Sequence, residues 1–344
     1  LSANDRHGPL GINEAVLYNL SYYPQSHEYY DWVELKNTSE EPLSLGDYYL
    51  TDSLKDPQQF QLPDVTLQPG ELTIVFCSGD ESLSTKRCIH APFAISAEGE
   101  SLYLFASDGT VSDRMYIHST RYGGSYGRLD NGSGFYFFAQ PTPGKDNGEG
   151  FRTVAALPET NIPQGVYNDV SDLSVELLGE GELHYTLDGS IPDRSSPLYT
   201  EPLLLDRSTV IRAIAVVDGK VDSDCASFSF FINEGHSLPV VSIVCEPGDM
   251  FSAANGGIYV NPTNDKEIDA NVAFFGEEGQ FARDCSLKLH GASSRKVWAK
   301  KSFKMIFRSR YGGELNYDVF QSGGICSFHS LLLRGGGIGS MHLI

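Results

Sequence analysis

Short runs of alternating apolar and polar residues, separated by turn residues, recur along the first two thirds of this 344-residue chain. Residues 31–37 alternate and then stop at a turn, residues 72–77 form a more apolar run, and residues 101–106 end at Ser107-Asp108-Gly109. The 35 Gly and 17 Pro supply the punctuation that such short elements need. Strands at short, regular spacing favour a β-sandwich. A chain of this length favours two or three domains.

Several motifs recur in order along residues 10–147: Ile12-Asn13-Glu14, residues 31–37, residues 45–52, residues 67–72, Gly127-Arg128 and Pro141-Thr142-Pro143-Gly144. With these motifs, residues 10–147 resemble the lamin tail domain family. The resemblance implies an immunoglobulin-like β-sandwich over residues 1–147, and in bacteria an accessory module of exported and surface proteins.

Residues 148–165 lack periodicity and are rich in Gly and Pro, which is typical of a linker. Residues 166–234 again read as strands. In the turn Asp188-Gly189-Ser190, we expect Asp188 to cap the turn and Gly189 to adopt a positive φ. This segment resembles the small β-sandwich at the C-terminus of chitobiase and β-hexosaminidase enzymes. That module is structural in those enzymes, so the resemblance implies no glycosidase activity.

The sign of the charge changes in the last part of the chain. The whole chain has 25 basic and 45 acidic residues, a net charge of −20. Residues 236–344 hold 11 basic and 10 acidic residues, so residues 1–235 hold the remaining 14 basic and 35 acidic residues. Between Arg283 and Arg310 there are nine Lys or Arg and one acid, Asp284. A local excess of cations on an acidic protein suggests a site for an anion.

The basic run lies on two predicted strands, residues 285–291 and residues 302–309. Alternation places Leu287, Leu289, Phe303, Met305 and Phe307 on the inner face. If the strands pair antiparallel, the cations Lys288, Lys304 and Arg308 share the outer face. A short helix is predicted over residues 247–255, with Pro near its start and Gly256-Gly257 after its end.

Spaced motifs occur in order through the last part of the chain, among them Leu238-Pro239, Gly257-Ile258-Tyr259, residues 287–291 and residues 300–304. With these motifs, residues 238–337 resemble the first half of the CotH family of spore-coat kinases. The resemblance implies an atypical protein kinase that uses ATP and Mg²⁺ in a full-length protein. The family's catalytic and metal-binding aspartates follow the segment that residues 331–337 match, so we expect them downstream of Ile344. We therefore expect an incomplete α+β kinase-like domain over residues 235–344 that is inactive in this chain.

Within this segment, a basic face and a small-residue turn suit the binding of nucleotide phosphates through ammonium and backbone N–H groups. The alternative is a solvated strand edge on which Lys residues prevent aggregation. The sequence carries no catalytic candidate, and no cofactor is expected in this chain. The phosphate-binding candidates are Lys288, Ser293, Ser294, Arg295, Lys300, Lys301, Lys304 and Arg308.

The six cysteines show no spacing typical of a metal site. Cys77 and Cys88 flank one polar loop and could close a disulfide; buried free thiols are the equal alternative. Glu14, Asp31 and Glu34 could ligate Ca²⁺, although such acids more often cap turns, and no metal is predicted.

The sequence therefore predicts a mainly β protein: two immunoglobulin-like sandwiches followed by the kinase-like segment. An acidic chain is a poor ligand for nucleic acid, and no apolar run is long enough to span a membrane. We expect an exported or cell-surface bacterial protein from which a signal peptide has been removed, although a shortened chain would also begin at Leu1. The competing hypothesis is a non-catalytic scaffold or adhesion protein that binds protein or glycan partners through its lamin-tail-like module. Aromatic pairs such as Tyr22-Tyr23 and Tyr29-Tyr30 prompt the glycan variant.

Overall fold

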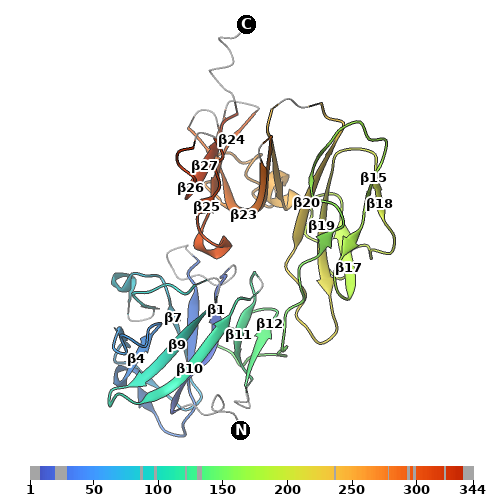
Figure 1. Ribbon diagram of the computed structural model, residues 1–344. Helices are drawn as coiled ribbons and strands as arrows, with labels where there is room; N and C mark the ends of the chain where they lie inside the picture. The colour runs from blue at the N-terminus through green and yellow to red at the C-terminus, as the bar shows by residue number, and fades with distance from the viewer. Residues whose placement is uncertain are drawn as a thin grey trace. The chain divides into compact units, whose positions relative to one another are not determined.

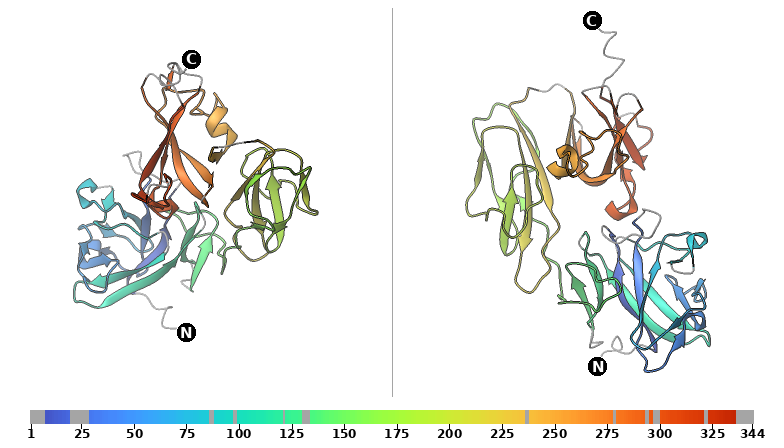
Figure 2. Two further views of the ribbon diagram at one scale, coloured as in Figure 1. Left: turned by 45° about the horizontal axis from the view of Figure 1, so that its top comes forward. Right: turned by 180° about the vertical axis from the view of Figure 1, so that it is seen from behind.

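In the structure, a computed structural model, most regular elements are β-strands and most strand pairs are antiparallel (Figures 1 and 2). It forms two compact units, Leu1–Ala155 with Val217–Asp222, and Ala156–Val216 with Ser223–Ile344. The prediction of a mainly β chain with sandwich domains is confirmed. The residues described are 8–19, 29–85, 88–96, 99–120, 122–129, 134–235, 238–277, 279–292, 295–296, 300–320 and 323–335.

Two sheets of unequal width make up the first unit (Figure 1). The wider sheet has the order β12 (Phe135–Phe138), β11 (Ser125–Arg128), β1 (Leu10–Val16), β2 (Trp32–Asn37), β7 (Leu72–Phe76) and β8 (Ile89–His90). The narrower one has the order β10 (Val111–His118), β9 (Gly99–Ala106), β4 (Tyr48–Thr51) and β5 (Phe60–Gln61). Smaller elements are β3 (Leu43–Ser44), β6 (Thr66–Leu67) and the 3₁₀ turns η1 (Leu45–Asp47) and η2 (Glu81–Leu83).

The core of the first unit lies between these sheets. Strand β10 shows how alternation builds it, because Met115 and Ile117 are buried while Arg114, Tyr116 and His118 are exposed. The facing strands contribute a cluster of aliphatic side chains that lose nearly all contact with water, which is the main favourable term in folding. This cluster includes Leu10, Ile12, Val33, Leu35, Leu50, Val75, Leu102 and Leu104.

A buried ion pair joins the two sheets. Asp113 of β10 lies beside a β-bulge, and its carboxylate accepts hydrogen bonds from Ile12 N (2.7 Å) and from Arg128 Nη2 (2.6 Å). Arg128 Nε donates to Ile12 O at 3.1 Å. The two charged side chains thus occupy both main-chain hydrogen-bonding groups of Ile12, and all three residues are at most 4% exposed.

The second unit begins with a small sandwich. Its main sheet has the order β14 (Gly165–Tyr167), β20 (Ala226–Ile232), β19 (Thr209–Val216) and β17 (Glu182–Thr186). The segment 148–165, which has the composition of a linker, includes the short strand β13 (Glu159–Thr160). Two strand pairs complete the module: β13 with β16 (Leu177–Leu178), and β15 (Leu173–Val175) with β18 (Leu203–Leu205).

The turn predicted after β17 is confirmed in detail. Gly189 has a φ of +85°, and Asp188 Oδ1 accepts hydrogen bonds from Ser190 N at 3.0 Å and from Ser190 Oγ at 2.6 Å. These are the two contributions that the sequence assigns to this turn.

Residues beyond the small sandwich form a five-stranded antiparallel sheet. Its order is β21 (Val240–Cys245), β22 (Ile268–Gly276), β23 (Gly279–His290), β24 (Ser302–Ile306) and β27 (Ser330–Leu333). A pair formed by β25 (Leu315–Asn316) and β26 (Ser327–Phe328), and a 3₁₀ turn η3 (Ser309–Tyr311), accompany it.

The helix predicted over residues 247–255 is shorter than expected. Helix α1 (Pro247–Phe251) has its proline in the first turn and ends where Ser252 takes an extended conformation. Gly256, with a φ of +70°, belongs to the loop that follows. Across the described residues, no helix has the length and apolar character required to cross a membrane.

We predict that replacing Asp113 with Asn destabilises the first unit strongly. The variant leaves Arg128 as a buried charge without its counter-ion, which typically costs about 3–5 kcal/mol. The measurement is urea unfolding followed by Trp32 fluorescence, in a Trp298→Phe background so that the buried Trp32 is the only tryptophan.

The matched control is Asp146→Asn. Asp146 pairs with Lys36 at 2.9 Å but is 68% exposed, and surface pairs contribute about 0–1 kcal/mol. Equal losses in the two variants would contradict the role assigned to the buried pair.

Candidate functional site

The basic strands of the second unit pair as predicted. Strands β23 and β24 are antiparallel, with Leu287 opposite Met305 and Lys288 opposite Lys304. Leu287, Leu289 and Met305 are buried in the core below the sheet, so alternation directs the two lysines to the outer face. Two like charges directly opposite each other are unfavourable unless an anion lies between or beside them.

Acidic side chains of the same unit lie beside several of these cations. Asp265, Glu267 and Asp269 lie at and just before the start of β22, spaced two residues apart. Lys288 Nζ is 3.7 Å from Glu267 Oε1 and 3.9 Å from Asp265 Oδ2. Further along, Arg308 makes a forked contact with Glu267 at 2.6–3.0 Å, the geometry that favours an Arg–carboxylate pair.

Two more cations are held in the same way. Arg295 Nη1 contacts Asp265 Oδ1 at 3.2 Å, and its other nitrogens donate to the main-chain oxygens of Pro262 and Asn264. Arg310 Nη2 is 2.9 Å from Asp269 Oδ1. Four of the nine cations between Arg283 and Arg310 are therefore paired with acids of the same unit. The sequence did contain a signal for this pairing: the acids at 265, 267 and 269 alternate, and residues two apart share one face of a strand.

The remaining candidates do not meet in one cavity. Lys301 Nζ donates to Arg295 O at 2.7 Å and lies 5.9 Å from the Tyr259 ring centroid. Lys300 is exposed and Lys304 half-buried. Ser293 and Ser294 lie outside the described residues, as does Trp298.

A hollow of about 410 Å³ opens beside Gly291. Of the predicted phosphate ligands, the described residues bring Arg295 alone into its wall. Lys296, which the sequence did not single out, is a second cation there. The lining is Pro262, Thr263, Gly291, Ala292, Arg295 and Lys296.

Cys77 and Cys88 are free thiols in the structure, which does not contain the disulfide considered from the sequence. The reason is the alternation of strand faces. Cys77 follows β7 and packs into the core between the sheets, whereas Cys88 packs beside Phe76 on the opposite face. Cys88 Sγ lies 3.2 Å from His90 Nε2 instead.

Two buried carboxylates hold the closing loop of the first unit. Glu14 and Glu34 lie opposite each other on β1 and β2, and both are fully buried. Glu14 accepts hydrogen bonds from Thr142 N (3.1 Å) and Ser125 Oγ (2.5 Å), and Glu34 accepts one from Gly144 N (2.6 Å). Their oxygens are thus engaged by the protein. Among described residues, no group of three or more metal-ligating side chains occurs.

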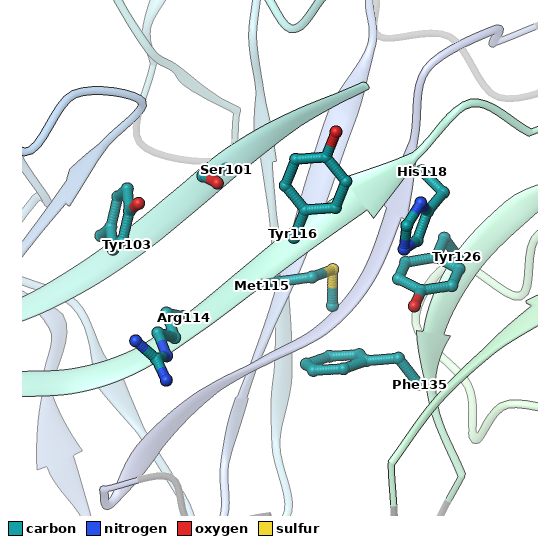
Figure 3. A pocket seen from close by; sticks show the side chains of 8 residues that line it. All are labelled: Ser101, Tyr103, Arg114, Met115, Tyr116, His118, Tyr126 and Phe135. Carbon is teal, nitrogen blue, oxygen red and sulfur yellow. The ribbon is translucent and has the colours of Figure 1, made fainter. Parts of the chain in front are cut away.

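A second hollow, of about 240 Å³, lies at the outer edge of β10 (Figure 3). Met115 and Phe135 approach from below the strand, and the rings of His118 and Tyr126 stand beside them with centroids 5.5 Å apart. Tyr116, 54% exposed, stands above, with its ring 4.8 Å from that of His118. The remaining lining is Ser101, Tyr103 and Arg114. The lining of this hollow thus combines aromatic rings with hydroxyl, imidazole and guanidinium groups.

Comparison with known families agrees with this architecture. Residues 7–119 match the Lamin Tail Domain, and residues 175–230 match the family described as Fn3 associated. A search of the curated proteins finds none that matches. These two matches suggest immunoglobulin-like β-sandwich modules. The resemblances to chitobiase-type modules and to CotH kinases rest on the sequence motifs alone.

We predict that the first unit loses stability as the pH rises from about 4.5 to about 7. Burial raises the pKa of Glu34 from 4.5 to about 7. A raised pKa means that the folded state holds its proton while the unfolded state releases it, so Glu34 lowers stability by up to about 1.4 kcal/mol per pH unit in this window. Burial also raises the pKa of Glu14, which acts in the same direction. Above the folded pKa the loss levels off.

Urea midpoints of the Trp298→Phe protein between pH 4.5 and 8 measure this dependence. Glu34→Gln should flatten the curve because one titrating group is removed. Asp108→Asn is the control, since hydrogen bonds from Thr110 lower the pKa of this exposed carboxyl out of the window. A Glu34→Gln curve as steep as that of the parent protein would contradict the assignment.

Proposed function

We propose that this chain belongs to an exported or surface-associated bacterial protein in which β-sandwich modules accompany a CotH-like kinase segment. In this chain the segment performs no phosphotransfer. The resemblance of residues 238–337 to that family supports the origin of the segment. The lamin tail and Fn3-associated domains support the modular, accessory character of the remainder.

The absence of activity is inferred from the pairing of the basic face with its own acids. Phosphoryl transfer needs cations that are free to stabilise phosphate charge and carboxylates that are free to hold Mg²⁺. Here Lys288, Arg295 and Arg308 contact Asp265 or Glu267. Each pair thus occupies a predicted phosphate ligand with a carboxylate of the chain itself. Nucleotide phosphates would have to displace these acids from their cations.

A second candidate function, that of a non-catalytic scaffold or adhesion protein, is favoured by the hollow beside β10. This hollow offers aromatic rings, hydroxyl groups and one guanidinium in a small volume. A glycan variant of this function draws on Tyr116, 54% exposed, and Tyr29, 45% exposed, whose rings could stack on sugars. Tyr30 is less accessible and packs edge-on against His90. Tyr22 and Tyr23 lie outside the described residues. A glycan array with no bound sugar would remove the glycan variant.

We predict that the purified chain transfers no label from γ-labelled ATP with Mg²⁺, either to itself or to an added acceptor protein. The Asp265→Asn/Glu267→Gln double variant should bind ATP more tightly than the parent chain by calorimetry, because it releases Lys288, Arg295 and Arg308. The control is Glu246→Gln, whose carboxylate accepts a main-chain hydrogen bond from Ile191. Phosphotransfer by the parent chain would overturn the proposal.

A further inference from the structure

The two sheets of the first unit do not cover each other completely. The wider sheet continues past β1 through β11 to β12, whereas the narrower one ends at β10, which packs against β1 (Figure 1). The core-facing side of β11 and β12 carries Tyr126, Phe135 and Phe137, which pack at the margin of the core. The place that one further strand beside β10 would fill is therefore lined with aromatic rings.

Alternate residues of β10 direct their main-chain N–H and C=O groups away from β9, toward the position that a further strand would fill. Arg114 N donates to Asp113 Oδ1 at 2.8 Å, and Ser112 O accepts from Gly8 N at 2.5 Å, so neither group is turned toward β9. Hydrogen-bonding direction alternates along an antiparallel strand, so Tyr116 and His118 point their N–H and C=O groups the same way. Among described residues, no neighbour pairs with this edge from Arg114 to His118. An open edge of this kind is a template for another strand.

The hollow at this edge has room for one side chain. Met115, almost fully buried, forms its floor with Tyr126 and Phe135, whose rings lie 5.7 Å apart, and His118 closes one end (Figure 3). Its 240 Å³ is smaller than the roughly 300–1,000 Å³ of sites for drug-sized ligands. A strand added beside β10 would place its core-facing side chain here and its neighbouring side chains on the outer face, because side chains alternate.

Charge selects the chemistry of that outer face. Arg114 is exposed, and the described residues contain no acid paired with its guanidinium. Several other described arginines are paired with acids, as in Arg128–Asp113, Arg295–Asp265, Arg308–Glu267 and Arg310–Asp269. An acidic side chain directly across from Arg114 would form a favourable cross-strand pair.

We propose that the open edge of β10 binds an extended peptide segment of a partner protein in which apolar and acidic residues alternate. The segment adds to the narrower sheet as a fifth strand, a recognised mode of peptide binding. Its backbone pairs with Tyr116 and His118, an apolar side chain enters the hollow above Tyr126 and Phe135, and an acidic side chain meets Arg114. This inference rests on the scaffold function proposed above and is independent of whether the second unit transfers phosphate.

The test is the panning of a random heptapeptide library against the whole chain, followed by affinity measurements on one enriched peptide. We expect enriched sequences to alternate apolar and acidic residues. Arg114→Glu should lower the affinity for the acidic peptide by about tenfold or more, because like charges that face each other across an interface repel. The same variant should bind a version of the peptide in which Lys replaces the acids. Lys55→Glu, an exposed charge reversal elsewhere in the unit, is the matched control.

A proline at position 116 separates strand addition from simple contact with the rings. The Tyr116 N–H is directed away from β9, so Tyr116→Pro keeps the β9–β10 ladder and removes one donor from the open edge. Tyr116→Ala removes the ring alone. We expect the proline variant to lose more affinity than the alanine variant, and Trp32 fluorescence in the Trp298→Phe background should show that both stay folded.

Three outcomes would overturn this inference: no enriched peptide, equal affinities of the proline and alanine variants, or a charge preference that Arg114→Glu leaves unchanged. Binding of an oligouronate in place of any peptide would indicate that the hollow beside β10 binds glycans, and this result would also overturn the inference. The phosphotransfer assay is read separately, so a failure here is distinguishable from a failure of the kinase-segment proposal.

Discussion

The contact of Asp113 with Ile12 and Arg128 determines where the two sheets of the first unit meet. It requires a bulge in β10 that turns Asp113 inward, and it occupies both main-chain hydrogen-bonding groups of Ile12. Burying two charges is costly, so such a pair stabilises only when its remaining hydrogen-bonding groups are satisfied, as they are here. Asp113 fastens β10, the last strand of the narrower sheet, over β1. The aromatic face of β11 and β12 lies beyond that strand.

Charge is handled differently in the two units. The first unit buries Glu14, Glu34, Asp113 and Arg128 and satisfies them with main-chain and side-chain partners. On the sheet of the second unit, cations and acids instead pair across the more exposed outer face. Surface pairs contribute little to stability, but they decide whether a phosphate would meet a free cation. Arg114 differs from both groups because the described residues leave its guanidinium without an acid, beside a hollow.

Local patterns in the sequence predicted individual elements well. Alternation placed Leu287, Leu289 and Met305 inside and Lys288 and Lys304 outside, and the register of β23 with β24 confirms it. The Asp188-Gly189-Ser190 turn follows from the properties of its own three residues. The predicted start of the helix at Pro247 is correct, but its predicted end lies too far along the chain. Nothing in the local sequence indicates that Ser252 adopts an extended conformation. Cys77 and Cys88 are close along the chain, yet they lie on opposite faces of one sheet.

By itself, the sequence determined the longer strands with their inner and outer faces and the mainly β character of the chain, because each depends on residues only a few positions apart. Which charges meet was decided by the tertiary structure. Asp265, Glu267 and Asp269 reach Arg295, Lys288, Arg308 and Arg310 only because β22 and β23 pair in one register. Likewise, the hollow beside β10 exists because a six-stranded sheet packs against a four-stranded one. This difference in width is set by the order of the strands in space. Contacts between residues about a hundred positions apart, such as Ile12 with Asp113, leave no periodic signal in the chain.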